Sequence, residues 1–123
     1  MSSPAKWFRG RRILVVEDEF LIGFAIASTL SDHGAETLGP IGTLSDALAR
    51  GEREGLQGAL LDLTLGHDTS TAVARVLRRR NIPFILMTGY GDESIPAELE
   101  AAPRLRKPFE QAALLEACRS LFM

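Results

Sequence analysis

Charged and hydroxyl-bearing residues follow four short runs of the chain at the point where each run ends. The runs are residues 13–16 before Glu17 and Asp18, 58–61 before Asp62, 84–87 before Thr88, and 104–106 before Lys107. Short runs of apolar residues that end in a loop are typical of buried strands in a parallel sheet, and ligands bind at the carboxyl ends of such strands. We therefore expect carboxylates, a hydroxyl and an ammonium group to meet at one edge of a sheet.

This set of side chains favours phosphoryl chemistry. Glu17, Asp18 and Asp62 would repel one another without a cation, and their hard oxygen ligands suit Mg²⁺ better than zinc. Lys107 and Thr88 are donors for an anion, so a phosphoryl group would fit between the metal and the ammonium group. Asp62 lies in the middle as a candidate nucleophile, which would form an aspartyl phosphate. Positioning and charge neutralisation carry most of such a transfer.

Each feature taken alone is more often structural. A Glu-Asp pair after a strand usually begins a loop or caps a helix, Thr88 alone would be a cap or turn residue, and Lys107 before a proline would be a surface turn. Asp62 is the most unusual of them, because it ends so apolar a run. The specific signal is that all of them occur together at the ends of successive strands.

The elements that must position these residues alternate between strand and helix. The expected strands are residues 13–16, 35–39, 59–62, 84–87 and a brief one around residue 105. Five helices are expected, of which the first spans residues 20–31 and the last residues 110–121. The second is capped by Thr43 or Ser45 and runs to about residue 50, and the third is capped by Thr69 or Ser70 and ends in Arg78–Arg80. The fourth is crowded by Gly89, Gly91 and Pro96. The apolar set of the first helix is broad and predicts that this helix is well buried.

This alternation predicts an α/β fold with a five-stranded parallel sheet and helices on both faces. In the flavodoxin-like doubly wound order 2-1-3-4-5, the first strand lies beside the third at the switch point. That arrangement would bring Glu17 and Asp18 to Asp62. A loop is expected at Gly66-His67-Asp68.

The composition bounds the class of protein. The 123 residues suit one domain, and the net charge of −2 gives no reason to expect a nucleic-acid partner. The single cysteine, Cys118, fits a reducing compartment and is interpreted as a packing residue. No apolar run is long enough to span a membrane and no signal peptide is recognisable, so we expect a cytoplasmic protein. His33 and His67 lack the spacing of metal ligands and are interpreted as surface residues.

The first residues of the chain differ in composition from the rest. Residues 1–11 are locally basic and contain glycine and proline, which predicts a flexible tail before a domain at residues 12–123. Trp7 and Phe8 could pack against the domain or against a partner, and the sequence leaves both alternatives open.

Four sequence segments carry a resemblance to a known family. ILVVEDE, LLDLTL, LMTG and RKPF, in this order and spacing, resemble the receiver domain of two-component response regulators, and the resemblance covers residues 12–122. It implies that Asp62 accepts a phosphoryl group from the phosphohistidine of a histidine kinase or a phosphotransfer protein. It also implies a signalling domain, which promotes its own phosphorylation and dephosphorylation, and not an enzyme with a separate substrate.

The resemblance also assigns roles around Asp62. Asp18, Asp62 and the backbone carbonyl of Thr64 would be Mg²⁺ ligands, with Glu17 acting through water. Thr88, Lys107, Gly89 and Leu63 would form the phosphoryl-binding and switch set. The bond between Lys107 and Pro108 is cis in relatives, which only proline makes accessible.

Several positions depart from the usual receiver pattern. The aromatic residue that usually lies three positions before the lysine is Arg104, the usual proline after the aspartate loop is Gly66, and the usual glycine of the third helix is Ser70. The TGYG segment, with Tyr90, instead resembles the subfamily named for its FAT-GUY motif, whose members are often paired with HWE-type or related histidine kinases. We hypothesise that Tyr90 and Arg104 take part in the switch.

The resulting prediction is a stand-alone receiver that signals through protein contacts or drains phosphoryl groups from a kinase. The resemblance implies that a downstream partner binds the face of helix four, strand five and helix five. An aspartate-nucleophile phosphatase would need a second acid where Thr64 stands. A flavin-binding module would need a phosphate loop where Glu17-Asp18-Glu19 would repel phosphate. A pseudo-receiver that works without phosphorylation is the remaining alternative, although it would be expected to lose Asp62, Asp18 or Lys107.

Overall fold

The computed structural model describes residues 5–89 and 95–122. Its main sheet has five parallel strands in the order β2-β1-β3-β6-β7. These strands are β1 (Arg12–Val16), β2 (Glu36–Ile41), β3 (Gly58–Asp62), β6 (Phe84–Thr88) and β7 (Arg104–Arg106). Since β6 and β7 are the fourth and fifth strands of the prediction, the doubly wound order 2-1-3-4-5 is confirmed.

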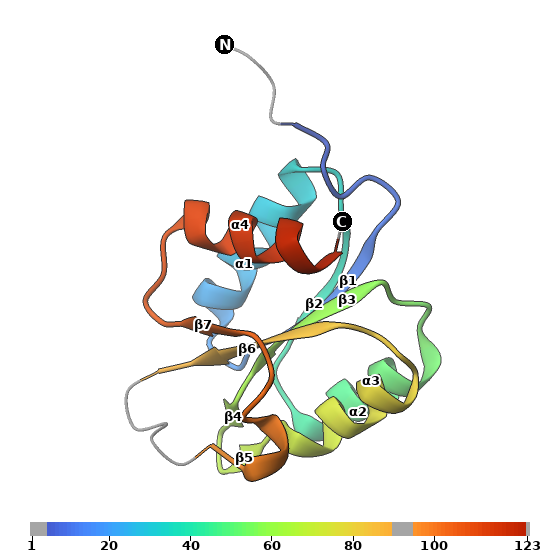
Figure 1. Ribbon diagram of the computed structural model, residues 1–123, viewed down its shortest axis with the longest axis vertical. Coiled ribbons are helices and arrows are strands. Elements are labelled where there is room, and N and C mark those ends of the chain that lie inside the picture. The colour runs from blue at the N-terminus through green and yellow to red at the C-terminus, as the bar shows by residue number, and fades with distance from the viewer. Residues whose placement is uncertain (1–4, 90–94, 123) are drawn as a thin grey trace.

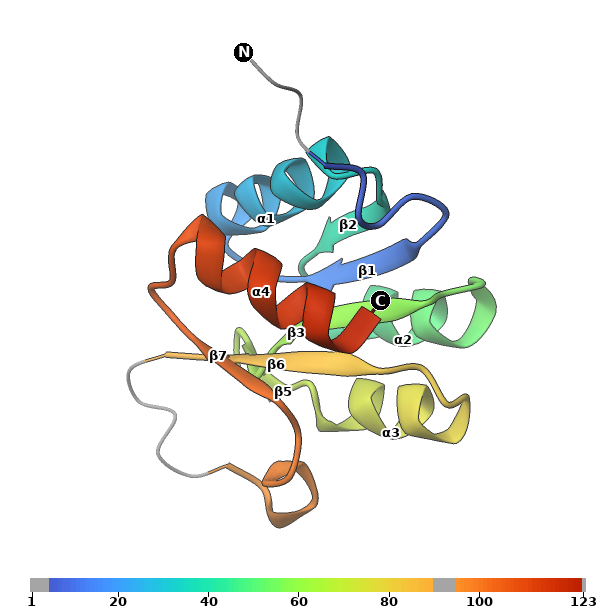
Figure 2. The ribbon, with the colours of Figure 1, turned by 45° about the horizontal axis from the view of Figure 1, so that its top comes forward.

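Two helices cover each face of this sheet (Figures 1 and 2). On one face lie α1 (Phe20–Asp32) and α4 (Gln111–Phe122), and on the other lie α2 (Leu44–Arg53) and α3 (Thr71–Arg79). Thr43 caps α2 as predicted, because its hydroxyl accepts a hydrogen bond from the Asp46 N–H at 3.3 Å. Ser70 is the residue before α3, but its buried hydroxyl makes no capping bond and has no hydrogen-bond partner among the residues that the structure describes. None of the helices in the described part of the chain is long and apolar enough to cross a bilayer.

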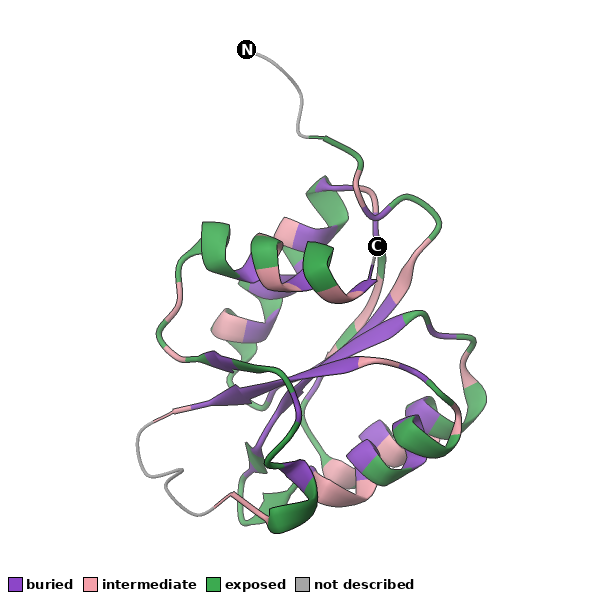
Figure 3. Cartoon of the chain, viewed as in Figure 1, coloured by how far each residue is buried: buried purple, intermediate pink, exposed green. Residues whose placement is uncertain are grey.

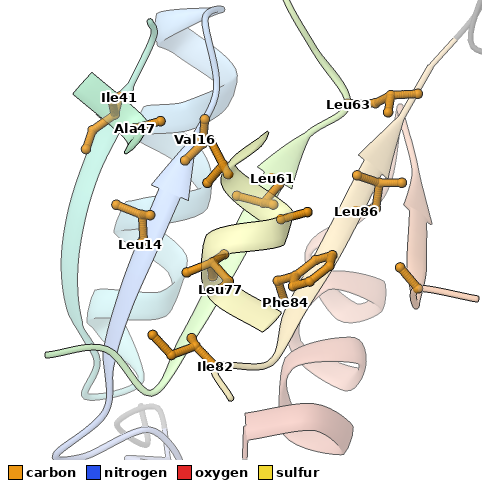
Figure 4. Close-up of a cluster of buried hydrophobic side chains, with 14 of the residues drawn as sticks. Leu14, Val16, Ile41, Ala47, Leu61, Leu63, Leu77, Ile82, Phe84 and Leu86 are labelled. Atoms are coloured by element: carbon orange, nitrogen blue, oxygen red, sulfur yellow. The ribbon is translucent and has the colours of Figure 1, made fainter. Parts of the chain in front are cut away.

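The strands alternate their side chains between two hydrophobic cores, as the two-residue period of a strand requires. Leu14 and Val16 of β1 point to the α2/α3 side, where Leu61, Leu77 and neighbouring residues pack around them (Figure 4). Ile13 and Val15 belong to the core beneath α1 and α4. The two central strands β3 and β6 are buried along their whole length (Figure 3), so they hold the ends of the strands in fixed positions.

The prediction that the first helix is well buried is wrong for one of its faces. Phe20, Leu21 and Phe24 are 67%, 82% and 58% exposed, and the two phenyl rings stack at 5.9 Å. Only the opposite face, which includes Ile26 and Leu30, packs on the sheet and α4. A helix that is apolar on most sides carries no signal that tells which face the rest of the fold will cover.

The N-terminal segment is part of the domain from residue 5 onward. Phe8 is fully buried in the α1/α4 core, and its N–H donates to the carbonyl of His33 at 2.9 Å. Trp7 stacks on the His33 ring at 4.9 Å, and the Arg119 guanidinium lies 4.1 Å from the Trp7 ring centre. The prediction of a loose tail is therefore wrong for residues 5–11, and Trp7 and Phe8 pack against the domain. The interpretation of His33 as a surface residue is also wrong, because Trp7 covers it.

The segment after β6 differs from the expected helix. Residues 90–94, which include Tyr90 and Gly91, lie outside the described residues, and the described residues that follow form only the 3-10 turn η1 (Ala97–Leu99). Pro96 comes directly before this turn, which suits a residue that cannot donate a backbone hydrogen bond. The predicted loop is confirmed at Gly66 and His67, which form the turn of a small antiparallel hairpin, whereas Asp68 already belongs to its second strand. The strands of this hairpin are β4 (Thr64–Leu65) and β5 (Asp68–Thr69).

Candidate functional site

The register of the sheet brings the predicted site residues together at the carboxyl ends of four strands. Val16 of β1 pairs with Leu61 of β3, so the residues that follow, Glu17 and Asp62, lie side by side. Thr88 of β6 pairs with Arg106 of β7, and Lys107 follows directly. The Lys107 N–H also donates to the Thr88 carbonyl at 2.6 Å, which ties the lysine backbone to β6. The Lys107–Pro108 bond is cis, as the resemblance predicted.

Lys107 bridges two buried carboxylates. Its Nζ lies 2.9 Å from Oε1 of Glu17 and 3.3 Å from Oδ2 of Asp62. Glu17 and Asp62 are only 1% and 3% exposed. The second oxygen of Glu17 accepts a hydrogen bond from the Glu19 N–H at 3.2 Å. The four strand ends thus hold one ammonium group against two carboxylates in a largely water-excluded position.

This environment shifts the proton affinities of the bridge. Burial raises the pKa of Asp62 to about 8, the Glu17 carboxylate adds to the rise, and the Lys107 charge opposes it. Burial alone would lower the pKa of Lys107, but its hydrogen bond to Glu17 and the charges of both carboxylates hold that pKa above its usual value. Lys107 therefore stays charged. Because Glu17 and Asp62 share this one charge, it does not fully stabilise the ionised form of Asp62.

Asp18 completes the acidic cluster from a more open position. It is exposed, and its Oδ2 accepts a hydrogen bond from the backbone N–H of Gly66 at 2.9 Å. Burial acts to raise the pKa of Asp18, but hydrogen bonds led by that of Gly66 bring it below the usual value. Carboxylate oxygens of Glu17, Asp18 and Asp62 all lie within 4.8 Å of one another.

The donor set fits a hard divalent cation. Three carboxylates face one ammonium group, so the cluster is short of positive charge, and all of its ligand atoms are oxygens. Asp18, Asp62 and Glu17 could hold Mg²⁺ there, with the carbonyl of Thr64 as a further predicted ligand. A cleft of about 360 Å³ opens at this position, and its walls include Asp62, Thr64 and Lys107.

The other predicted phosphoryl-binding residues surround this cleft in different ways. Thr88 is the last residue of β6 and is 8% exposed, and Gly89 lines the cleft. Leu63 has its side chain in the core, and its N–H donates to the Met87 carbonyl at 2.9 Å, so its phosphoryl contact stays a prediction. Arg104 is exposed and donates to the Glu100 carbonyl at 2.7 Å. Tyr90 lies outside the described residues.

Sequence reasoning missed the two backbone N–H groups that hold the acids. Glu19 donates to Glu17 and Gly66 donates to Asp18. Every residue type except proline carries a backbone N–H, so no pattern in the sequence indicates such a contact. The only available signal was that Gly66 replaces a proline, which has no N–H to donate.

The comparisons with known proteins agree with this fold. No protein-family model matches the chain. The chain is 33% identical to the sensory transduction protein RegX3 of Mycolicibacterium smegmatis over an alignment of 113 positions that covers 89% of this chain and 49% of RegX3. It therefore spans about half the length of this curated relative. The solution structure of SdrG from Sphingomonas melonis Fr1 is 35% identical, covers 100% of both chains and has a TM-score of 0.76.

A second solved structure carries the name of the family. A CheY-like response regulator receiver domain protein from Methanospirillum hungatei JF-1 is 27% identical, covers 89% of this chain and 91% of its own, and has a TM-score of 0.76. The chain belongs to the receiver domains of two-component response regulators. The resemblance to the FAT-GUY subfamily stays a prediction.

Proposed function

We propose that this chain accepts a phosphoryl group on Asp62 from a histidine kinase or a phosphotransfer protein in a Mg²⁺-dependent reaction. The observation that carries the proposal is the bridge of Lys107 between Glu17 and Asp62, with Asp18 beside it. The candidate nucleophile Asp62 and the charged Lys107 both line one cleft, and the other carboxylates proposed to bind the cation lie beside Asp62. The pseudo-receiver alternative uses none of these groups.

The proposed step transfers the group between two side chains. A carboxylate oxygen of Asp62 forms a bond to phosphorus, the phosphorus–nitrogen bond of the donor's phosphohistidine breaks, and the imidazole nitrogen keeps the electron pair and takes up a proton. Lys107, 3.3 Å from Asp62 Oδ2, is placed to pair with an oxygen of the phosphoryl group. When bound, Mg²⁺ would supply positive charge that favours the ionised carboxylates and the phosphoryl oxygens.

The surface beside the cleft favours a protein as the phosphoryl donor. A groove of about 440 Å³ between α1 and the start of α4 shares Ile22, Lys107 and Pro108 with the cleft. The exposed Leu21 lines this groove, and the stacked pair Phe20 and Phe24 continues the apolar surface along α1. Exposed apolar groups of this kind mark protein contacts. We place the donor here and propose an HWE-type or related kinase.

The remaining parts of the proposal concern the output. In the labels of the structure, the proposed downstream face consists of η1, β7 and α4. The chain would act as a stand-alone cytoplasmic signalling domain or as a phosphate sink, without a separate substrate to turn over. The exposed Arg104 lies on β7 within this face.

The test is the intact mass after incubation with phosphoramidate, with and without Mg²⁺, for the native chain and for Asp62→Asn. We expect a gain of one phosphoryl group that requires both Mg²⁺ and Asp62. A gain that persists in Asp62→Asn would refute the assignment of the acceptor. If the native chain accepts no phosphoryl group from phosphoramidate or from an autophosphorylated HWE-type kinase, the pseudo-receiver alternative replaces the proposal.

The donor surface has its own test, with a matched pair of variants on one helix. Ala25 and Ser28 are both small, exposed residues of α1, but only Ala25 lines the groove. Ala25→Asp should slow transfer from an autophosphorylated HWE-type kinase about tenfold, while Ser28→Asp, which adds the same charge outside the groove, should change it little. Phosphoramidate should phosphorylate both variants at the native rate. Equal effects of the two substitutions on the kinase reaction would contradict the placement of the donor.

A further inference from the structure

We propose that Gly66 is a positioning residue of the cation site, because its backbone N–H holds the Asp18 carboxylate in place for Mg²⁺. The inference rests on the proposed function and adds a residue to the same site. The Gly66 nitrogen lies 2.9 Å from Oδ2 of Asp18, although 48 residues separate them in the sequence.

Asp18 is the carboxylate of the cluster that most needs such an anchor. Glu17 and Asp62 are buried, and Lys107 bridges them. Asp18 is exposed, so its side chain would otherwise sample several rotamers in water. A side chain that is already held by a hydrogen bond loses less conformational entropy when it binds a cation.

The contact leaves Asp18 able to bind a cation. An ionised carboxylate has two oxygens with about four acceptor positions, and the Gly66 N–H takes one position on Oδ2. A carboxylate oxygen of Asp18 also lies within 4.8 Å of ligand oxygens on Glu17 and Asp62. The hydrogen bond thus fixes the carboxylate while it still faces the cluster.

The local backbone explains why a glycine occupies this position. Gly66 is the first of the two residues that connect β4 to β5, and its φ of +61° lies in the left-handed region. Glycine is favoured at the first position of such a two-residue hairpin turn. A Cβ added at Gly66 would meet no atom of the described residues within 4 Å, so the requirement is conformational and not steric. The hairpin turn thereby directs the N–H towards Asp18.

Two substitutions at this position separate the N–H from the side chain. Asparagine tolerates positive φ and keeps the N–H, whereas proline removes the N–H and requires a φ near −65°. We expect Gly66→Asn to bind Mg²⁺ with a Kd within about twofold of the native value. Gly66→Pro should bind about three- to tenfold more weakly, which corresponds to the ordering of one side chain. Isothermal titration with MgCl₂ measures these values.

Further measurements distinguish positioning from a general disturbance of the loop. In an Asp18→Ala background, Gly66→Pro should change the remaining Mg²⁺ affinity by less than about twofold, because the two residues act through one contact. In the metal-free protein, hydrogen exchange of the Gly66 amide should be slow in the native chain and faster in Asp18→Ala. If Gly66→Pro does not fold, an ester in place of the amide at residue 66 removes the N–H alone.

The outcomes separate this inference from the proposed function. Equal Mg²⁺ affinities of the native chain and of the variants without the N–H would overturn the inference and leave the proposed function standing. Exchange of the Gly66 amide that does not respond to Asp18→Ala would overturn it as well. A native chain that binds no Mg²⁺ would overturn both.

Discussion

Replacing Asp62 with asparagine should make the metal-free protein more stable. In the folded chain, burial and the neighbouring Glu17 raise the pKa of Asp62 from 3.8 to about 8. The unfolded chain binds fewer protons at this site than the folded chain, so the contribution of Asp62 to stability is lost as pH rises from about 4 to about 8. Asp62→Asn removes the ionisable carboxyl group, which must take up a proton on folding, and so removes this loss.

The size of this change in unfolding free energy follows from the pH range in which Asp62 is protonated in the folded chain but ionised in the unfolded chain. The ordinary pKa of 3.8 lies about 3.2 pH units below pH 7, and each unit corresponds to about 1.36 kcal/mol. The stability lost at pH 7 is therefore at most about 4 kcal/mol. Asp62→Asn also gives up the contact with Lys107, and water can enter the cleft, so we expect a gain of about 2 kcal/mol at pH 7. For a domain of this size, that raises Tm by about 6–10 °C.

The assay is urea unfolding in EDTA at pH 5, 7 and 8, followed by circular dichroism. The advantage of Asp62→Asn over the native chain should grow with pH. Asp68→Asn makes the same chemical change at an exposed position and should stay within about 0.5 kcal/mol of the native chain. If Asp62→Asn is no more stable than the native chain at pH 8, or if its advantage shrinks as pH rises, the argument from buried charge is wrong.

Three further predictions test the metal, the N-terminal segment and the core. MgCl₂ should raise the Tm of the native chain more at pH 8 than at pH 5.5, because protons compete for the carboxylates, and a differential scanning calorimeter that records equal shifts would contradict this. Phe8→Ala should cost about 3–5 kcal/mol of unfolding free energy by urea titration, and Arg9→Ala should cost less than about 0.5, whereas a loose tail would make both harmless. Gly58→Ala would place a Cβ 2.5 Å from the Phe122 ring and should cost about 1–3 kcal/mol of unfolding free energy. Gly55→Ala, whose added Cβ would meet no described atom within 4 Å, should be near neutral in the same titration.

The sequence was sufficient for the topology and for most of the site. Apolar runs that end in Asp62, Thr88 and Glu17 indicate buried parallel strands, and the alternation with helices leaves few arrangements of a sheet. Because parallel strands all deliver their carboxyl ends to one edge, the residues after each strand had to meet. Neither step requires knowledge of which side chains touch.

The tertiary structure decided the contacts that give the site its properties. The bridge from Lys107 to Glu17 and Asp62, and the bond from the Gly66 N–H to Asp18, join residues 45 to 90 positions apart. Such contacts depend on the relative placement of loops, which residue type and periodicity do not encode. The raised pKa of Asp62 follows from burial and from the neighbouring Glu17 carboxylate, against the opposing charge of Lys107, so it was also invisible in the sequence.

The packing of the N-terminal segment and of α1 could not be predicted from the sequence either. A short basic segment with glycine and proline looks like a tail, yet Phe8 is fully buried in the core beneath α1 and α4. The apolar residues of α1 have helical spacing on most sides, and only the docked position of the helix leaves Phe20, Leu21 and Phe24 in solvent. Local pattern determines which residues form an element, whereas the surfaces that the other elements cover determine which of its faces stays open to water or to a partner.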